Sequence, residues 1–576
     1  MKSNPFAVEH PENLRIDEVR KLFVEEATNI RNLMSKDHTI IWGARGSGKS
    51  MVLRYLEAID FINDTKRSNK FISVYIPIKE GMFNKSEFEE IPEKFGAVLS
   101  EHLFNMYIAL KIINIIEIHL KDTKCREMSD KVEEYVQDIK ELFGYITLID
   151  TIECIDKLET KPVGMELLKK IFCIEISKVK YYLDALTLEV DRQYKGATTG
   201  YLDFLLPFMR RTLKLLNVER LKFYLLLDDV GRMHEFQQRI INGWIANRDQ
   251  SIICVKMSAV KSDYKTFMTE NNWKIETPHD YAELETDDVY TSQGTDYYKK
   301  VKLICNRRLE LFGINEIDIS DYLPPDDKQQ SMLNDIKKEY ENSTEDNLDD
   351  LISHELFSKI GNGSRNYAGF DNLVCISSGV VRDFLQPCQV MYNRALEQSE
   401  NGILKSIPSN IQNDVITEFA KNYLSKVDII KRDVGVEDYA IVDILKTFIQ
   451  TIGELFYNRL KDKNKIEKRI FTFIVKDSKN LPREYNKMLE FGIAYGYFKK
   501  VSSSSKQGGG NYPRYILSRR LAPAFKIDPT SIKGKIELSA KDIELACVNP
   551  SQFLSKKLGE IATDIEQVKS EQLRFY

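Results

Sequence analysis

The sequence predicts an α/β fold built on a parallel sheet, with a helical part and a smaller C-terminal module behind it. Apolar runs such as Ile40–Trp42 and Leu221–Leu227 are almost continuously hydrophobic, as strands are when both faces of their sheet are covered. These runs alternate with helical stretches, which is typical of βαβ units. A glycine-rich octapeptide also joins the first run to a helix, a connection that many parallel sheets use to bind phosphate.

Five segments are candidates for the strands of this sheet. They are His38–Trp42, Phe71–Ile76, Leu221–Leu227, Ser251–Met257 and Trp273–Glu276. The chain between the second and third segments has helical periodicity and is much longer than a crossover requires. We therefore expect a helical insertion at about Glu89–Thr198.

The octapeptide Gly43–Ser50 fills the phosphate-binding template G-x-x-x-x-G-K-[ST] completely. Its glycines allow backbone N–H groups to curl around a phosphate, and the following helix directs its positive end at the same anion. Lys49 would reach the β- and γ-phosphates, and the Ser50 hydroxyl would bind Mg²⁺. A chance glycine-rich turn is the alternative. The expected nucleotide-binding residues are Gly43, Ala44, Arg45, Gly46, Ser47, Gly48, Lys49, Ser50 and Met51.

An acidic pair follows the third apolar run, where ligands bind at the carboxyl edge of a parallel sheet. We expect Asp228 to hold Mg²⁺, directly or through water, and Asp229 to polarise the water that attacks the γ-phosphate. Ser258 ends the next strand and could hydrogen-bond the same water or the γ-phosphate. Paired acids at a strand end also serve as helix caps, which is the alternative.

Composition indicates a protein of several domains with enough apolar residues for their cores. The 576 residues are 43% hydrophobic and carry a formal net charge of −4. The polar start Met1–Asn4 predicts no N-terminal signal, and the longest apolar stretch, Ile108–Leu120, is interrupted and too short to span a bilayer. The eight cysteines form no C-x-x-C pair, so we expect reduced thiols in the cytoplasm and no zinc site.

Basic residues are concentrated near the C-terminus. Between Asn458 and Lys526 there are 17 Lys and Arg against 5 Asp and Glu, which favours contact with a polyanion such as double-stranded DNA over a merely solvated basic face. The pattern resembles a winged helix, with helices at Ile441–Arg459, Ile466–Val475 and Leu481–Tyr495, followed by a hairpin of Tyr497–Val501 and Arg514–Leu517. Such a module can instead dock proteins.

A winged helix places its third helix in the major groove and its wing on the DNA backbone. The residues expected to contact DNA phosphates are Arg483, Lys487, Lys499, Lys500, Lys506 and Arg514, together with Arg519 and Arg520.

Together these motifs resemble those of an AAA+ ATPase of the origin-recognition type, the replication-initiator family with a C-terminal winged helix. The resemblance is carried by Walker A (Gly43–Ser50), Walker B (Leu225–Asp229), Met257–Ser258 at the sensor 1 position and Gly379–Arg382 at the sensor 2 step. It implies ATP and Mg²⁺ as cofactors, and a helical lid from which Arg382 contacts the γ-phosphate. On spacing alone, Gly379–Arg382 could equally be an ordinary helix start.

The resemblance also implies self-assembly, because an arginine finger normally serves the nucleotide of a neighbouring subunit. Arg248 is the first candidate for this finger, and Arg307 or Arg308 the second. Two features depart from the family pattern: the helical insertion is longer, and Walker B ends in Asp-Asp rather than Asp-Glu, which favours slow hydrolysis. Bacterial stand-alone members, some found beside mobile elements or phage-defence genes, are also similar.

The expected domains are an ATPase core at 1–325, a helical lid at 326–435, a winged helix at 436–526 and a tail at 527–576. Two functions remain open. The first is an ATP-switched DNA-binding protein. The second is a signalling or antiviral-defence ATPase of the STAND-like kind, which oligomerises on ATP and docks a partner protein through its helical insertion.

Overall fold

The chain forms two compact units, Glu9–Asp287 and Asp288–Tyr576, the second of which includes the N-terminal residues Met1–Val8. The computed structural model describes residues 4–28, 30–64, 70–78, 82–121, 127–144, 149–156, 162–186, 193–247, 252–286, 294–341, 348–360, 365–399, 404–461, 470–501, 512–530 and 534–559.

The first unit is built on a five-stranded parallel sheet, which confirms the predicted fold class. The strands lie in the order β2-β3-β4-β1-β5, and every neighbouring pair is parallel. Strand β4 thus separates β1, which leads into the octapeptide, from β3, which ends in the acidic pair. The strands are β1 (Thr39–Trp42), β2 (Phe71–Pro77), β3 (Lys222–Asp228), β4 (Ile253–Ala259) and β5 (Ala282–Glu285).

Alternation along the strands assigns their side chains to two separate cores. In β3, Phe223, Leu225 and Leu227 belong to the core shared with the helical insertion. Tyr224 and Leu226 belong to the core on the other face, which α3 (Lys49–Ala58) covers. Because side chains alternate with a period of two, Asp228 continues the second set and faces α3.

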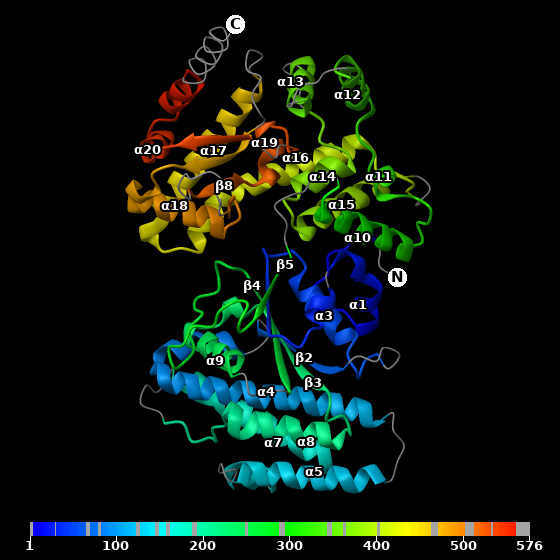
Figure 1. The fold of residues 1–576 in the computed structure, drawn as a ribbon, viewed down its shortest axis with the longest axis vertical. Coiled ribbons are helices and arrows are strands. Elements are labelled where there is room, and N and C mark those ends of the chain that lie inside the picture. Colours follow the sequence, from blue (N-terminus) through cyan, green and yellow to red (C-terminus); the bar gives the residue numbers. More distant parts are fainter. Residues whose placement is uncertain are drawn as a thin grey trace. The chain divides into compact units, whose positions relative to one another are not determined.

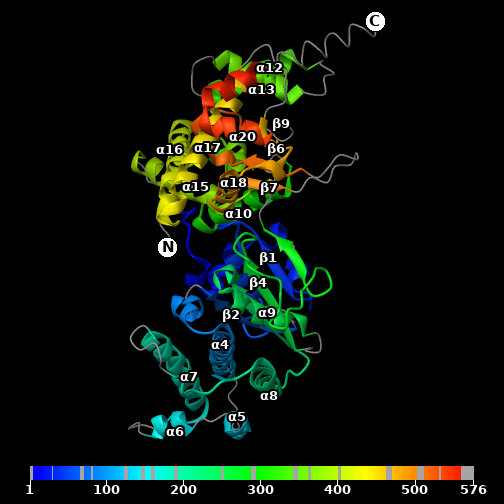
Figure 2. The ribbon, with the colours of Figure 1, turned by 90° about the vertical axis from the view of Figure 1, so that its left-hand side faces the viewer.

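The helical insertion is confirmed and covers the first of these faces. Helix α4 packs against β2 and against α7 and α9, while α5 packs against α7 and α8. Figures 1 and 2 show these helices in successive layers on one side of the sheet. The remaining helices of this unit are α1 (Ile16–Leu22), α2 (Ile30–Leu33), α4 (Glu93–Lys121), α5 (Glu127–Gly144), α6 (Ile149–Asp156), α7 (Gly164–Leu186), α8 (Leu206–Leu215) and α9 (Glu235–Ala246).

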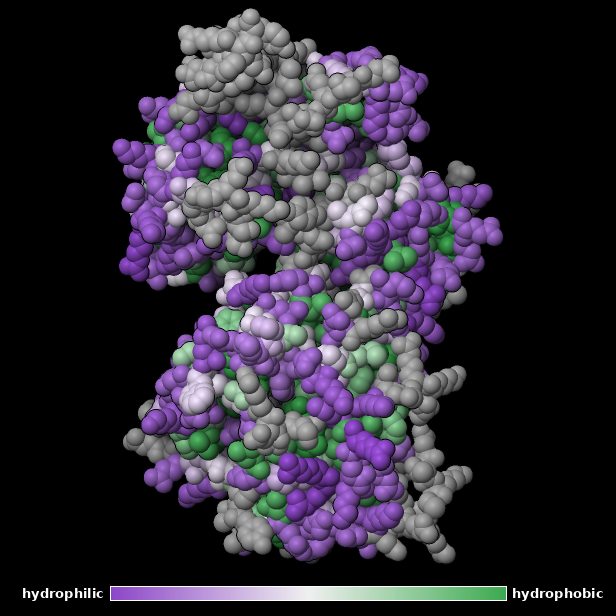
Figure 3. Space-filling view, viewed as in Figure 1, coloured by the Kyte–Doolittle hydropathy of each residue, from purple (hydrophilic) through white to green (hydrophobic). Residues whose placement is uncertain are grey.

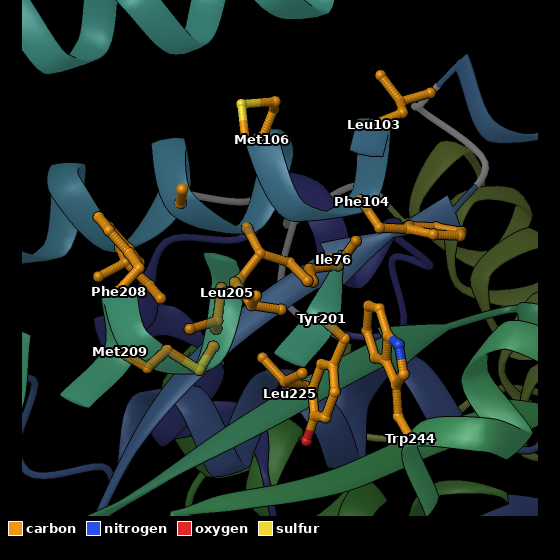
Figure 4. Close-up of a cluster of buried hydrophobic side chains, with 14 of the residues drawn as sticks. Ile76, Leu103, Phe104, Met106, Tyr201, Leu205, Phe208, Met209, Leu225 and Trp244 are labelled. Atoms are coloured by element: carbon orange, nitrogen blue, oxygen red, sulfur yellow. The ribbon is translucent and has the colours of Figure 1, made fainter. Parts of the chain in front are cut away.

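Aromatic side chains tie the insertion to the sheet. Phe104 of α4, Ile76 of β2 and Leu225 of β3 lie in one buried cluster (Figure 4). In the same view the ring of Tyr201 stacks on Trp244 of α9, with ring centroids 5.0 Å apart. The insertion is therefore part of the main core of this unit.

A buried polar cluster anchors α4 to the end of the insertion. His102 Nδ1 lies 2.9 Å from Thr199 Oγ1, and His102 Nε2 lies 3.8 Å from the Glu175 carboxylate. Lys178 donates a 3.0 Å hydrogen bond to Glu175. Burial, with a smaller contribution from the charge of Lys178, lowers the pKa of His102 to about 3.

This lowered pKa predicts that the first unit loses stability in mild acid. His102 stays neutral in the native state but takes up a proton near pH 6.5 when unfolded, so acid favours the unfolded state. The free energy of unfolding should fall between pH 6.5 and pH 3, by about 1.4 kcal/mol per pH unit from this residue. Urea unfolding at pH 7 and pH 5 measures it, with His102→Gln as the reference. Equal pH dependence in both proteins would contradict the assignment.

One expected strand of the first sheet is wrong. Residues Trp273–Glu276 form no strand, and their only β-pairing among the described residues is an isolated bridge between Met268 and Lys274. Trp273 is 75% exposed. The fifth strand is β5, whose burial alternates as in an edge strand covered on one face. In β5 the charged Glu283 and Glu285 alternate with Ala282 and Leu284, so the segment lacks the apolar run by which the other strands were predicted.

The second unit begins with a helical bundle. Its N-terminal residues pack on this bundle, since Asn4 Nδ2 donates to Gln389 O at 2.9 Å and Arg308 Nη1 donates to Ala7 O at 3.0 Å. The helices are α10 (Asp296–Phe312), α11 (Ile319–Tyr322), α12 (Asp327–Glu339), α13 (Leu348–Ile360), α14 (Phe370–Ile376), α15 (Val381–Glu397) and α16 (Ser409–Ser425).

The C-terminal part of this unit has the element order of a winged helix, with one correction. Residues 470–475, expected as a helix, form the strand β6 (Ile470–Val475), and 466–469 lie outside the described residues. The run Ile-Phe-Thr-Phe-Ile-Val is rich in β-branched and aromatic residues, which favour a strand. Among the described residues between α17 and α18, a 3-10 turn, Ser478–Asn480, is the one helical element.

The remaining elements match the expected winged helix. Strands β7 and β8 pair as the predicted hairpin, and β8 also pairs with β6, both antiparallel. A further strand, β9, adds to β6 in parallel and gives the order β7-β8-β6-β9. The elements are α17 (Tyr439–Lys461), α18 (Arg483–Ala494), β7 (Phe498–Val501), β8 (Arg514–Leu517), α19 (Ala522–Phe525), β9 (Gly534–Leu538) and α20 (Ala540–Val548).

The drawn face of the molecule is largely hydrophilic, with hydrophobic residues in small scattered groups (Figure 3). Within the part of the chain that the structure describes, no helix combines the length and the apolar composition that crossing a membrane requires.

Candidate nucleotide-binding site

The octapeptide forms a tight loop between β1 and α3. Gly46 and Gly48 have φ of +91° and +103°, in the region that glycine adopts without strain. A Cβ atom on Gly48 would meet nothing within 4 Å, so the backbone angle and not crowding requires glycine there. The loop thus delivers the chain into α3 at Gly48, its N-cap, and directs the helix N-terminus into the loop.

Lys49 lies inside this loop. Its side chain is 5% exposed, and Nζ donates to Gly43 O at 2.9 Å and to Ala44 O at 3.1 Å. The other end of the loop is fixed by the Ser47 hydroxyl, which lies 2.6 Å from Thr286 Oγ1. The ammonium group is therefore held beside the backbone that would surround a phosphate.

Asp228 is held by donors from three elements. Its Oδ2 accepts from Tyr75 Oη at 2.8 Å, and its Oδ1 accepts from Ser258 Oγ at 2.5 Å. Ser50 of α3 makes a further side-chain hydrogen bond to it. Burial raises the pKa of Asp228, as does the charge of Asp229, while these three hydrogen bonds lower the pKa.

Asp229 turns away from this buried carboxylate. Its φ of +61° lies in the left-handed region, which Asp tolerates better than most residues. Its N–H donates to Ser258 Oγ at 2.9 Å, and its carboxylate lies 3.8 Å from Arg232 Nε. The two acids therefore have distinct surroundings: Asp228 is buried in a hydrogen-bond network, and Asp229 reaches solvent.

This donor set fits a triphosphate with a hard divalent cation. The loop offers backbone N–H groups and an ammonium, and Ser50 and Asp228 offer oxygen ligands of the kind that Mg²⁺ prefers. The structure brings Lys49, Ser50, Asp228, Asp229 and Ser258 to one edge of the sheet, as the motifs predicted. Elsewhere in the described chain, His, Cys, Asp and Glu form no metal-binding group of three.

Ser258 is hydrogen-bonded to both residues of the acidic pair. Its one hydroxyl proton is donated to Asp228 while its oxygen accepts from Asp229 N–H. The expected contact with water or the γ-phosphate stays a prediction. Sequence reasoning missed Tyr75. In the sheet, Tyr75 is paired with Leu226 of β3 and therefore lies on the same face as Asp228, two residues further along that strand.

The candidate arginines that the structure describes have different surroundings. Arg248 lies outside the described residues. Arg307 pairs with Glu310 at 3.0 Å, and Arg308 binds the N-terminal segment. Arg382 lies in the first turn of α15, at the helix start that was predicted from Gly379–Arg382. Its contact with a nucleotide stays a prediction.

Two of the expected DNA-contacting residues, Lys499 and Arg514, lie on one face of the C-terminal sheet. Residues that are paired across neighbouring strands lie on the same face of a sheet. Lys499 is paired with Ile516, and Ile516 with Thr472. Thr472 is in turn paired with Lys535, so these residues form one row across the sheet. Arg514 lies on the same face, which is opposite to the one that α18 covers through Met488 and Phe498.

The remaining members of this set differ in their surroundings. On α18, Arg483 is exposed, and Lys487 is paired with Asp438 at 2.6 Å. Lys500 is exposed on β7, and Lys506 lies outside the described residues.

Two further arginines are engaged within the second unit. Arg519 is buried, so its expected phosphate contact is wrong, and the expected contact of Arg520 stays a prediction. Arg519 is 6% exposed, and its backbone N–H donates to Ser378 Oγ at 2.9 Å. Arg520 pairs with Asp383 of α15 at 3.0 Å, and its guanidinium lies 3.7 Å from the ring centroid of Tyr423. Both hold the winged helix on the helical bundle, a role that a basic sequence run does not reveal.

Comparison with known proteins points to one family. The model of the ORC-CDC6-like family matches residues 4–360 and 348–538. Comparison with curated proteins gives no match.

Several solved structures are similar to the chain at low identity. The ORC2 protein of Aeropyrum pernix, in ADPNP-ADP complexes, is 11% identical, with 96% of this chain and 98% of that chain covered and a TM-score of 0.31. The ORC1 protein of Aeropyrum pernix, in complex with DNA, is 10% identical, with 91% and 95% covered and a TM-score of 0.30. Cdc6p from Pyrobaculum aerophilum is 10% identical, with 97% and 99% covered and a TM-score of 0.25. Scores this low carry no argument about function.

Proposed function

Since the chain belongs to the ORC-CDC6-like family of AAA+ nucleotide-binding ATPases, we propose that it is an ATP-hydrolysing switch that binds double-stranded DNA through its basic winged helix. The observation that carries this proposal is the Asp228 carboxylate, held opposite a phosphate-binding loop by Tyr75, Ser258 and Ser50. A site with so many matched donors is arranged for a charged ligand rather than for packing.

ATP with Mg²⁺ is the cofactor that fits. Lys49 would neutralise the β- and γ-phosphates, and Ser50 and Asp228 would hold the metal ion. Bound Mg²⁺ would stabilise charge on the transferred phosphoryl group. Asp229, which reaches solvent, would orient and deprotonate the attacking water. Its side chain is shorter than the Glu that the family often has there, so we propose slow turnover.

The remaining parts of the proposal concern the helical lid and the formation of a homo-oligomer. We propose a division into an ATPase core, a helical lid and a winged helix, expected at 1–325, 326–435 and 436–526. Helices α10 and α11, inside the first range, belong to the second unit, and β9, inside the expected tail (527–576), extends the sheet of the winged helix. Arg382 would reach the γ-phosphate from the lid, and Arg248 would serve a neighbouring copy in a homo-oligomer. Nucleotide state would then be transmitted to the winged helix as a change in its placement.

Contact with DNA is supported by the basic excess of residues 458–526 and by the placement of three basic residues. Lys499 and Arg514 share the outer face of the C-terminal sheet with Lys535, and Arg483 is exposed at the start of α18. Lys487 contributes less to this surface, because Asp438 already compensates its charge.

The DNA-binding proposal predicts a steep dependence on salt. The logarithm of the association constant falls linearly with the logarithm of the salt concentration, and each phosphate contact that is lost makes this fall less steep by about 0.9. Lys499→Ala and Arg514→Ala should therefore each weaken binding to unrelated duplexes to a similar extent and reduce this slope by about one. Fluorescence anisotropy over a salt series measures it. Lys446→Ala is the control, since Lys446 pairs with Asp428 on another surface. A flat salt dependence of the wild-type protein would contradict the proposal.

A second candidate is an ATP-driven scaffold, of the kind found in phage defence, that docks a partner protein through the helical insertion. One set of contacts favours it: α4 is bonded directly to α9, the helix that follows the acidic pair. Gln237 Nε2 donates to Ser100 Oγ at 3.0 Å, and Trp244 Nε1 donates to Glu101 at 3.3 Å. A partner bound on the insertion could thus affect the nucleotide site.

Measurement of mass with and without ATP separates the two candidates. Assembly driven by ATP, with no DNA affinity at low salt, would favour the scaffold. DNA affinity that changes with the bound nucleotide would favour the switch.

A further inference from the structure

We infer that Tyr75 is a positioning residue for the metal-binding carboxylate. Tyr75 stands on β2, a strand that carries neither phosphate-binding motif, and its Oη donates to Asp228 Oδ2 at 2.8 Å. Ser258 stands on β4 and donates to the other oxygen, Oδ1, at 2.5 Å. Since β3 lies between β2 and β4, the two neighbouring strands hold one oxygen each.

The pleat of the sheet produces this arrangement. Tyr75 lies in the core that α3 covers, together with Tyr224 and Leu226, and Asp228 continues that face two residues beyond Leu226. In β4, Cys254 lies on this face, and Ser258 follows four residues later with the same parity. All three side chains therefore converge beneath the N-terminus of α3.

The ring of Tyr75 is fixed as well. The residue is 7% exposed, and the guanidinium carbon of Arg54 lies 5.1 Å from the ring centroid. Arg54 is itself held, because its Nη2 donates to Leu14 O at 2.7 Å and its Nε donates to Pro11 O at 3.2 Å. The phenol is thus confined from one side by α3 and from the other by the sheet.

This geometry assigns a specific task to the phenol hydroxyl. Each carboxylate oxygen can accept more than one hydrogen bond, so a donor on each still leaves room for a metal ion or a metal-bound water. With both oxygens fixed, the carboxylate does not have to reorient when the metal binds. Without Tyr75 the carboxylate keeps its hydrogen bonds to Ser258 and Ser50 but loses the donor that fixes Oδ2.

The inference rests on the nucleotide site of the proposed function, and its test separates the two. ATP affinity is measured by calorimetry on the full chain, once with Mg²⁺ and once with EDTA. Tyr75→Phe should reduce the gain in affinity that Mg²⁺ provides by about tenfold or more and leave the affinity in EDTA unchanged. In steady-state hydrolysis, the Mg²⁺ concentration for half-maximal rate should rise by a similar factor.

Tyr224→Phe is the matched control. Tyr224 is a buried tyrosine of the neighbouring strand, and its hydroxyl oxygen lies 2.9 Å from both Met34 O and Ser35 O, which share its single proton, away from Asp228. It should leave both affinities at the wild-type values. Ser258→Ala, which removes the opposite donor, should act in the direction of Tyr75→Phe and provides a second test if that variant does not fold.

Three outcomes distinguish the claims. A Mg²⁺-dependent gain that falls in Tyr75→Phe and persists in Tyr224→Phe supports the inference. If both tyrosine variants keep the wild-type gain, or if Ser258→Ala keeps it where Tyr75→Phe does not fold, the inference is overturned while the ATPase proposal stands. If the wild-type protein shows no Mg²⁺-dependent ATP affinity, the proposed function itself fails.

Discussion

Lys49→Ala is expected to reduce ATP hydrolysis by at least about 100-fold, the scale of losing one well-placed electrostatic donor from an active site. The side chain is almost fully buried, and its ammonium lies within 3.1 Å of two loop carbonyls, those of Gly43 and Ala44. Its loss removes a positive charge held beside the phosphate-binding backbone. Phosphate release under saturating ATP and Mg²⁺ is the measurement, with melting curves to verify the fold.

Lys261→Ala is the matched control for this prediction. Lys261 lies in the same unit, just beyond the end of β4, and pairs with Glu285 at a solvent-exposed position. Its replacement should leave turnover within about twofold, because exposed ion pairs contribute little. Equal losses in the two variants, or full activity of Lys49→Ala, would show that the loop is not the catalytic phosphate site.

Asp528→Asn is expected to destabilise the second unit by about 3–5 kcal/mol, the range for removing one partner of a buried ion pair. Asp528 and Arg365 are 4% and 7% exposed, and Arg365 Nη1 lies 3.1 Å from Asp528 Oδ1. Asp528 also accepts a hydrogen bond from Ser353 of α13 and one from Thr530 N–H at 2.9 Å. The variant keeps the shape of the side chain but leaves the Arg365 charge buried without a counter-charge.

Spectroscopy can assign this loss to the correct unit. All three tryptophans, Trp42, Trp244 and Trp273, lie within Glu9–Asp287, so tryptophan fluorescence follows the first unit and circular dichroism follows both. The loss should appear in circular dichroism alone. The double variant Arg365→Met/Asp528→Asn should recover part of the stability, because no buried charge then remains unpaired. An unchanged circular dichroism transition in Asp528→Asn would contradict the prediction.

Much of the nucleotide site could be predicted from sequence, because the phosphate loop and the acidic pair are local. Gly43–Ser50 specifies its own backbone, and Asp228 follows directly from the strand that carries it. Tyr75 could not be found in this way, since its importance depends on which strands are neighbours. Only the order β2-β3-β4 makes Tyr75 and Ser258 the two flanking donors.

The errors in the predicted fold have similar causes. The run Ile470–Val475 is short and apolar, so its periodicity does not distinguish a helix from a strand. Its β-branched and aromatic residues favour a strand, which pairs with β8 and β9. Arg519 and Arg520 look like members of a basic surface, yet Asp383 and Tyr423 from distant parts of the chain enclose Arg520. Charge in the sequence does not distinguish a solvated arginine from a structural one.

Titration of ATP into the full chain in the presence of Mg²⁺ measures whether the loop before α3 is a nucleotide site. We expect saturable binding of one nucleotide per chain, which weakens in EDTA and is abolished in Lys49→Ala. Heats no larger than those of dilution, for a wild-type protein that is folded by circular dichroism, would contradict it.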